Sequence, residues 1–199
     1  MEKRRVVITG IGMVTPLGND VPTSWENLLK GKSGADFITH FDASKFKTRF
    51  ACEVKNLDMS SILDPKEARR YDRCIHYAIK SAEEAMLDAQ IDVNQEDALR
   101  CGIIYGSGMG GVHTLDVNIG GYGAGDGTPR HSPFFIPMSI TNMAAGLLAI
   151  RYGFKGVNYA TTSACASSAH AIAGAYYQIR MGLAKVSRWL CKPLDASRS

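Results

Sequence analysis

The sequence predicts an α/β protein with a mostly parallel sheet, because short apolar strands alternate with longer segments of helical periodicity. Buried-type strands are expected at residues 5–11, 101–105 and 157–160, and helices at 64–89 and 139–152. No internal repeat interrupts this alternation. A chain of 199 residues that is 45% hydrophobic is long enough to bury one substantial core.

The N-terminal quarter of the chain begins with the strand 5–11 (RVVITGI), which runs into a loop rich in Gly and Pro. A short helix should follow and end at Leu29, with Thr23 or Ser24 as its N-cap. The next stretches are expected to be a loop at 32–47 and a strand at 50–54.

A long helix is predicted over 64–89, because its start carries three N-terminal signals. Asp64 is a good N-cap residue, Pro65 suits the first helical position, and Glu67 completes a capping box. Apolar side chains then recur at helical spacing from Ile75 to Leu87.

The strand 101–105 is followed by a glycine-rich loop, Gly106 to Gly111, that formally fits the G-x-G-x-x-G dinucleotide pattern. We expect an irregular segment from there to Pro137 rather than an amphipathic helix, so the match indicates a tight turn. Gly10-x-Gly12 lacks the third glycine, and no Walker A motif is present. The sequence therefore argues against nucleotide binding.

Cys165 lies between the strand 157–160 and a predicted helix over 167–183, which Ser167 or Ser168 can cap and Gly182 can help to end. Free amide donors and the helix dipole at such a turn favour a thiolate, which makes Cys165 a candidate nucleophile. The alternative is a buried cysteine that acts as a small hydrophobe. Its neighbours are small and polar, and chemistry alone leaves both interpretations open. His170, on the same helix, is expected to face away from a substrate at the helix start.

Composition narrows the classes of partner. The net charge of +4 and the pI near 8.8 are too mild for a nucleic-acid binder, and no stretch is apolar enough to span a membrane. The five cysteines are odd in number and form no CxxC pair, which predicts reduced thiols in the cytoplasm and neither a disulfide framework nor a zinc site. The N-terminus shows no signal peptide, and the scattered histidines form no metal cluster.

Three segments carry a family resemblance: RRVVITGIGMVTPLG at the start, SPFFIPMSITNMAAG at 132–146, and the turn around Cys165. Their order and spacing resemble the β-ketoacyl-acyl-carrier-protein synthases, the condensing enzymes of fatty acid synthesis, and in particular the elongating type called synthase II. The resemblance implies the N-terminal half of a thiolase-like fold, a mixed sheet with helices on both faces. It also implies a homodimer without a metal or redox cofactor.

In the family a cysteine takes an acyl chain from acyl carrier protein, and malonyl-loaded carrier protein then loses CO2 and attacks the thioester. The resemblance implies that Cys165 is this nucleophile and that its backbone N–H is one of two oxyanion donors. It also places Met109 and Phe135 in the acyl pocket near the dimer interface, with core packing as the alternative. Lys66, Arg69 and Arg70 would dock the acidic carrier protein, with a solvated helix face as the alternative.

The resemblance implies a domain at 1–186 and a tail at 187–199 that fits neither a strand nor the family. Arg188, Trp189 and Leu190 can be encoded so that a shift of one base reads Gly-Gly, which suggests a frameshifted continuation of a longer gene. The catalytic histidines and lysine of the family have no matching motif in these 199 residues. Two functions therefore compete: a condensing enzyme truncated before those histidines, and a non-catalytic scaffold that binds carrier protein or a partner subunit. A thiolase-type acyl-CoA enzyme is a weaker third option.

Overall fold

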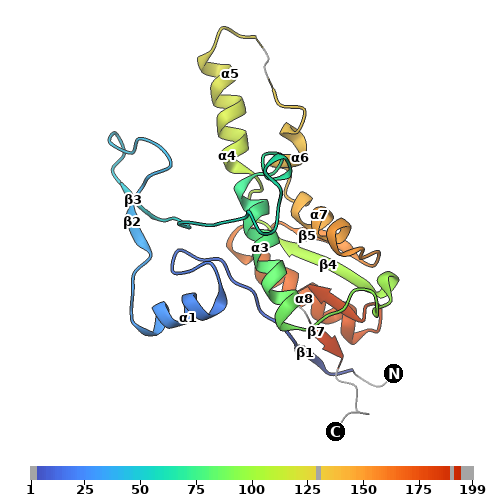
Figure 1. Cartoon of the computed structure of the whole chain (residues 1–199). Coiled ribbons are helices and arrows are strands. Elements are labelled where there is room, and N and C mark those ends of the chain that lie inside the picture. Colours follow the sequence, from blue (N-terminus) through green and yellow to red (C-terminus); the bar gives the residue numbers. More distant parts are fainter. Residues whose placement is uncertain (1–3, 129–130, 189–190, 194–199) are drawn as a thin grey trace.

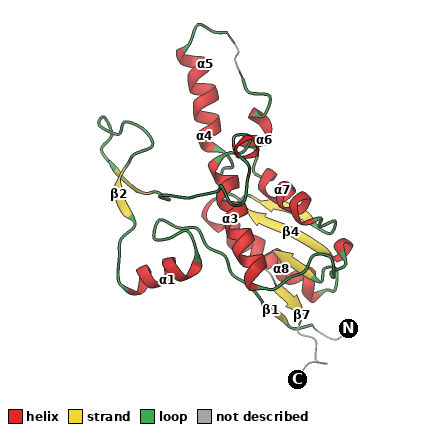
Figure 2. Ribbon diagram, viewed as in Figure 1, coloured by secondary structure: helices red, strands yellow, loops and turns green. Residues whose placement is uncertain are grey.

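A five-stranded mixed sheet in the order β1-β7-β6-β4-β5 forms the centre of the computed structural model, which describes residues 4–128, 131–188 and 191–193. Strand β4 (Cys101–Gly106) pairs in parallel with β5 (Asn158–Thr161) on one side and with β6 (Val186–Arg188) on the other. On the other side of β6, strand β7 (Cys191–Pro193) runs antiparallel to both β6 and β1 (Val6–Ile8). Figure 2 shows these strands side by side in one layer. The prediction of a mixed sheet is confirmed.

Helices cover both faces of this sheet, as predicted (Figure 1). Alternate side chains of β4 point to opposite faces. Ile103 joins a core made with α3 (Arg73–Asp88) and α7 (Met143–Tyr152), whereas Ile104 packs against Ala171 and Ala175 of α8 (Ser167–Arg180). Both isoleucines are fully buried, so β4 is the strand that joins the two cores.

The predicted helix over 64–89 is two helices, because the sequence holds a second N-cap that we did not anticipate. Asp64 caps α2 (Pro65–Ala68) through the N–H groups of Lys66 and Glu67. The chain then turns, and Asp72 caps α3 by accepting the N–H of Cys74 at 3.0 Å. An aspartate with an extended backbone begins a helix rather than continues one.

Residues 112–124, after the loop 106–111, are helical, and the prediction of an irregular stretch to Pro137 is wrong for them. A first turn, α4 (Val112–Leu115), continues through a π-helical turn (Asp116–Gly120) into α5 (Gly121–Ala124). Figure 1 shows them as one rod that projects from the body. Its glycines at 120 and 121 have helical backbone angles, so their freedom does not break the helix. A further short helix, α6 (Phe135–Ser139), precedes α7.

Residues 20–52 stand apart from the sheet in Figure 1. Helix α1 (Val21–Leu29) begins three or four residues earlier than predicted, because its N-cap is Asp20, which accepts the N–H of Thr23, rather than Thr23 or Ser24. The expected loop at 32–47 contains β2 (Ala35–Phe37), which pairs with β3 (Phe50–Cys52) in a separate antiparallel ribbon. A one-turn 3-10 helix at Ala98–Arg100 directly precedes β4.

The expectation that the tail forms no strand is wrong for its described part. Ser187 and Arg188 lie in β6, and β7 inserts between β6 and β1. The backbone of this segment thereby supplies the hydrogen-bonding partner that β1 uses. Residues 189–190 and 194–199, which the frameshift hypothesis also concerns, lie outside the described residues.

Candidate functional site

Cys165 lies on a tight turn between the end of β5 and the start of α8, as the sequence predicts. The turn is a single 3-10 helical turn, Ala164–Ala166, and the Cys165 thiol is exposed. The alternative interpretation, a buried cysteine that acts as a small hydrophobe, is therefore wrong. Within the described residues no acceptor takes the backbone N–H of Cys165, as expected for the first turn of a helix.

The residue before Cys165 has a strained backbone. Ala164 has φ of +48°, a left-handed conformation that costs a residue with a Cβ roughly 1–2 kcal/mol. Strain of this kind persists only where the surroundings hold it. The left-handed conformation of Ala164 lets the chain leave the strand, expose the Cys165 side chain and enter the helix within a few residues.

The side chain of Ser167 holds this strained turn through two hydrogen bonds. Its Oγ accepts the N–H of Ser163 at 2.8 Å and donates to the carbonyl of Ala164 at 2.7 Å, and the residue is 3% exposed. We expected Ser167 or Ser168 to cap α8. Instead the N-cap position is Ala166, without a side-chain hydrogen bond, because the Ser167 hydroxyl is engaged one turn earlier.

The neighbouring strand brings a glycine against the same turn. A Cβ on Gly106 would lie 2.6 Å from the carbonyl carbon of Ser167 and from the N of Ser168, so a larger residue would displace the start of α8. Thr161 donates its hydroxyl to the Ser167 carbonyl at 2.8 Å. The N–H of Ser107 donates to the Thr161 carbonyl at 3.1 Å, which joins the strand ends.

His170 turns back toward this site, contrary to the prediction that it faces away. Its Nδ1 lies 2.8 Å from the Oγ of Ser163, and the two atoms share a hydrogen bond. The reason is the direction of helical side chains, which lean toward the helix N-terminus. A histidine on the second turn of a helix therefore reaches a polar side chain that precedes the helix, and this spacing is the signal in the sequence that we missed.

The other thiols whose side chains are described differ from Cys165 in environment. Burial and the nearby Asp72 carboxylate raise the pKa of Cys74 to about 12, so this thiol stays protonated. Cys101 is fully buried in β4, and Cys52 is exposed on β3. Cys52 is thus the exposed thiol against which Cys165 has to be compared.

The two predicted acyl-pocket residues occupy different surroundings. Met109 is 71% exposed on the loop 106–111. A Cβ added to Gly108 would contact Ala164 in the Cys165 turn, and the N–H of Gly111 donates to the carbonyl of Ser139 at the end of α6. Phe135 begins α6 and stacks on His131, with ring centroids 5.6 Å apart. Met109 therefore lies on the segment that connects the cysteine turn to α6, and Phe135 lies at the far end of that helix.

The predicted basic cluster is exposed. Lys66 lies in α2, and Arg69 and Arg70 lie in the turn that follows it. The guanidinium of Arg70 lies 5.2 Å from the centroid of the Phe134 ring, a cation–π contact that anchors this turn to the segment before α6. Of the three, Arg70 thus has a structural partner as well as solvent exposure.

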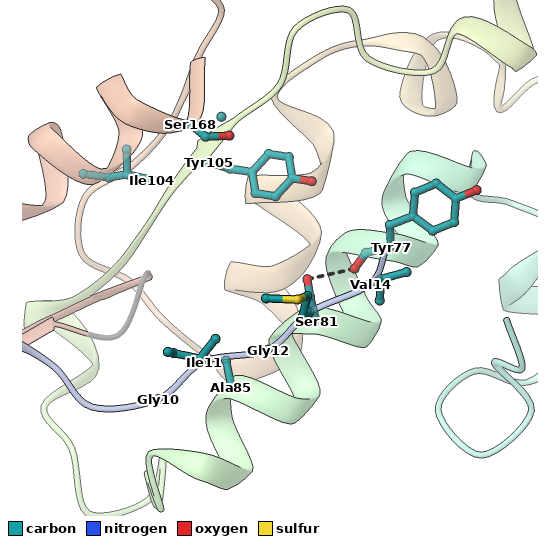
Figure 3. Close-up of a pocket in the computed structure, with 12 residues that line it drawn as sticks. Gly10, Ile11, Gly12, Val14, Tyr77, Ser81, Ala85, Ile104, Tyr105 and Ser168 are labelled. Carbon is teal, nitrogen blue, oxygen red and sulfur yellow. Dashed lines mark hydrogen bonds between the residues drawn. The ribbon is translucent and has the colours of Figure 1, made fainter. Parts of the chain in front are cut away.

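A cavity of about 310 Å³ opens between the loop 10–14, α3, the end of β4 and the start of α8 (Figure 3). Helix α8 contributes Ser168, three residues after Cys165, to the lining of this cavity. Neither Met109 nor Phe135 lines it, so this cavity is distinct from the predicted acyl pocket. Its lining consists of Gly10, Ile11, Gly12, Met13, Val14, Tyr77, Ser81, Ala85, Ile104, Tyr105, Gly106 and Ser168.

No three His, Cys, Asp or Glu side chains of the described chain gather closely enough to hold a metal ion. In the same residues, no helix has the length and apolar character that crossing a membrane requires.

A mixed sheet with helices on both faces and an exposed cysteine turn after β5 defines a thiolase-like architecture. The sequence model of the family "Beta-ketoacyl synthase, N-terminal domain" matches residues 3–187, and the chain belongs to this family. It resembles the ishigamide ketosynthase/chain length factor, with a TM-score of 0.85 and 25% identity over 93% of this chain and 46% of that one. It also resembles a β-ketoacyl synthase from Burkholderia phymatum STM815, with a TM-score of 0.78 and 27% identity over 92% and 45%.

Curated relatives are closer in sequence. The chain is 46% identical over 181 residues to 3-oxoacyl-(acyl-carrier-protein) synthase 2 of Staphylococcus aureus (strain COL), which covers 91% of this chain and 44% of that protein. It is 43% identical over 185 residues to the protein of the same name from Synechocystis sp., covering 93% and 44%. The chain therefore spans less than half the length of these relatives.

Proposed function

We propose that the chain is the nucleophile-bearing part of a β-ketoacyl-acyl-carrier-protein synthase of the elongating type, in which Cys165 receives an acyl chain as a thioester. The observation that carries the proposal is the exposed Cys165 on a strained turn between β5 and α8, directly after Ala164 with its φ of +48°. The name of its curated relatives, 3-oxoacyl-(acyl-carrier-protein) synthase 2, supports the substrate class.

The chemistry that this turn favours is acyl transfer. The Cys165 thiolate attacks the carbonyl carbon of an acyl thioester, and the negative charge moves to the carbonyl oxygen in the tetrahedral intermediate. The backbone N–H of Cys165 is available to donate to that oxygen, and the carrier thiolate then leaves. In the whole synthase, decarboxylation of malonyl-carrier protein supplies the carbanion that takes the acyl chain from Cys165.

Self-acylation tests this function on the chain as it stands. The protein is incubated with a limiting amount of S-octanoyl-N-acetylcysteamine, a soluble acyl thioester, and the modified residue is located by mass spectrometry. We expect octanoyl on Cys165 and none in a Cys165→Ala variant. Preferential acylation of Cys52, the other exposed thiol among the described cysteine side chains, in the unmodified chain would contradict the proposal.

We further propose that the exposed cations Lys66, Arg69 and Arg70 dock acyl carrier protein, loaded with either an acyl or a malonyl group. They lie together on α2 and the turn after it, where an acidic partner can meet all three. Each exposed charge contributes little alone, but three together steer an acidic partner.

A homodimer in the cytoplasm is the assembly that we propose for the synthase. The helical rod 112–124 supports it, because this rod projects from the body and exposes Val117, Ile119 and Tyr122 by 56%, 58% and 48%. Apolar side chains exposed on one projecting element are typical of a surface that a second subunit covers. Light scattering after size-exclusion chromatography measures the oligomeric state directly.

The alternative function is a non-catalytic scaffold that binds carrier protein or a partner subunit. None of the five histidines in this sequence lies in a motif that matches the catalytic histidines of the family. Binding of carrier protein together with failure of Cys165 to accept an acyl group would favour this scaffold over the synthase.

A further inference from the structure

The hydrogen bond between Ser163 and His170 spans the turn that carries Cys165. Ser163 precedes the strained residue Ala164, and His170 is the fourth residue of α8. The 2.8 Å contact between Ser163 Oγ and His170 Nδ1 therefore connects the chain before the strained residue to the helix after Cys165.

Three hydrogen bonds besides the one to His170 orient this turn, and one of them, from the Ser167 hydroxyl to the Ala164 carbonyl at 2.7 Å, holds the peptide that carries the Cys165 N–H. The N–H of Ser163 donates to Ser167 at 2.8 Å, and its carbonyl accepts the N–H of Ala166 at 3.0 Å. Both contacts orient the peptide groups on either side of the Ser163 Cα. The side-chain contact to His170 adds a third point that fixes Ser163, the residue before Ala164, while Ser167 holds the Ala164 carbonyl on the other side of the strained residue.

The Ala164–Cys165 peptide carries the N–H group proposed above as the oxyanion donor. A small rotation about Ala164 moves this N–H away from the developing negative charge while it leaves the exposed sulfur accessible. We infer that Ser163 and His170 are positioning residues, whose hydrogen bond holds the Cys165 N–H in place for acyl transfer. This inference rests on the proposed function, because it assigns them a role in the acylation of Cys165.

Two reagents separate positioning from a general effect on the thiol. Acylation by S-octanoyl-N-acetylcysteamine passes through an oxyanion, whereas alkylation by iodoacetamide is a displacement at carbon that forms none. We expect Ser163→Ala and His170→Ala each to slow acylation of Cys165 by about two- to tenfold, the range for loss of one hydrogen bond. Alkylation of Cys165 should stay at the rate of the unmodified chain.

Conservative replacement and a double variant complete the test. His170→Asn places an amide near the position of Nδ1 and should restore acylation. Combining Ser163→Ala with His170→Ala should cost no more than either change alone, since both remove the same contact. His113→Ala, an exposed histidine on α4, is the matched control and should leave both rates unchanged.

The failures of the two proposals are distinguishable. If the unmodified chain is not acylated at Cys165, the proposed function is wrong and this inference falls with it. If Cys165 is acylated at the same rate in all variants, or if acylation and alkylation fall together, only the positioning role is overturned. Should His170→Ala fail to fold by circular dichroism, Ser163→Ala and His170→Asn decide the question.

Discussion

The carboxylate of Asp72 accepts two hydrogen bonds from Thr114, one from the hydroxyl at 2.6 Å and one from the backbone N–H at 2.9 Å. Asp72 also caps α3, so one buried side chain connects the start of α3 to the start of the helical rod 112–124. Burial pushes the pKa of Asp72 upward, but the hydrogen bonds from Thr114 and Cys74 outweigh it and hold the pKa below its ordinary value.

Asp72→Asn should lower the free energy of unfolding by roughly 1–3 kcal/mol, because it weakens hydrogen bonds to a buried carboxylate. The folded-state pKa lies below the unfolded value of about 3.9, so the contribution of Asp72 is complete above that pH. It is lost as the pH falls through the lowered folded-state pKa. Urea denaturation between pH 7 and pH 2 should therefore show a weaker acid dependence in the variant.

The control for this series is Asp116→Asn, an exposed aspartate on the same helical rod. It should follow the unmodified chain at every pH. Identical acid dependence of the Asp72→Asn variant and the unmodified chain would exclude a stabilising role for the charge on Asp72.

Gly106→Ala should destabilise the fold by roughly 1–3 kcal/mol, because the new methyl group overpacks the start of α8. The added Cβ would meet the backbone of Ser167 and Ser168 at 2.6 Å, and backbone atoms cannot move aside as a flexible side chain can. Since this strain reaches the turn of Cys165, acylation of Cys165 should also slow. Thermal unfolding and acylation rates measure the two effects.

Gly146→Ala is the matched control, because nothing lies within 4 Å of the Cβ it would add and the residue sits inside α7. This change should be stabilising by about 0.4–1 kcal/mol, owing to the lower entropy of the unfolded chain. A Gly106→Ala variant as stable as the Gly146→Ala variant would show that β4 and α8 are not in close contact.

Lys66→Glu combined with Arg69→Glu should weaken the binding of acyl carrier protein by at least tenfold at low salt. Arg70 is left in place because its guanidinium packs over Phe134, and its loss would disturb the turn. Surface plasmon resonance at two ionic strengths should show that affinity in the unmodified chain falls with salt. Lys45→Glu with Lys47→Glu, on the exposed loop before β3, introduces the same charge change as a control. Equal affinities for both double variants would show that the basic cluster is a solvated helix face and does not dock the carrier protein.

A polypeptide of these 199 residues should form no β-ketoacyl product from acyl- and malonyl-carrier protein. Decarboxylation needs donors for the enolate oxygen, and removal of one such donor typically costs about 10²–10³ in rate. His40 and His76 are engaged elsewhere, with Arg73 and with the carbonyl of Ala68. Mass spectrometry of the reaction detects any product. Product from a homogeneous preparation would contradict the prediction and direct attention to His170.

Much of the fold could be predicted because it depends on local pattern. The apolar strand 101–105 and the glycine at the end of the helix 139–152 appear in the structure close to where they were expected. The predicted helix over 64–89 failed at Asp72, because the strong N-terminal signals at Asp64 outweighed a second capping residue that stands directly before the apolar pattern from Ile75. The helical rod at 112–124 was not predicted, because its many glycines suggested a loop.

The sequence by itself determined the α/β class, the cysteine between a strand and a helix, and the family, because each depends on residue types at short spacing. The tertiary structure decided that Cys165 is exposed and that Ala164 is strained. It also decided that β7 lies between β6 and β1. These features depend on which segments pack together, and a side-chain contact or a strand pairing between them leaves no periodic signal in the chain.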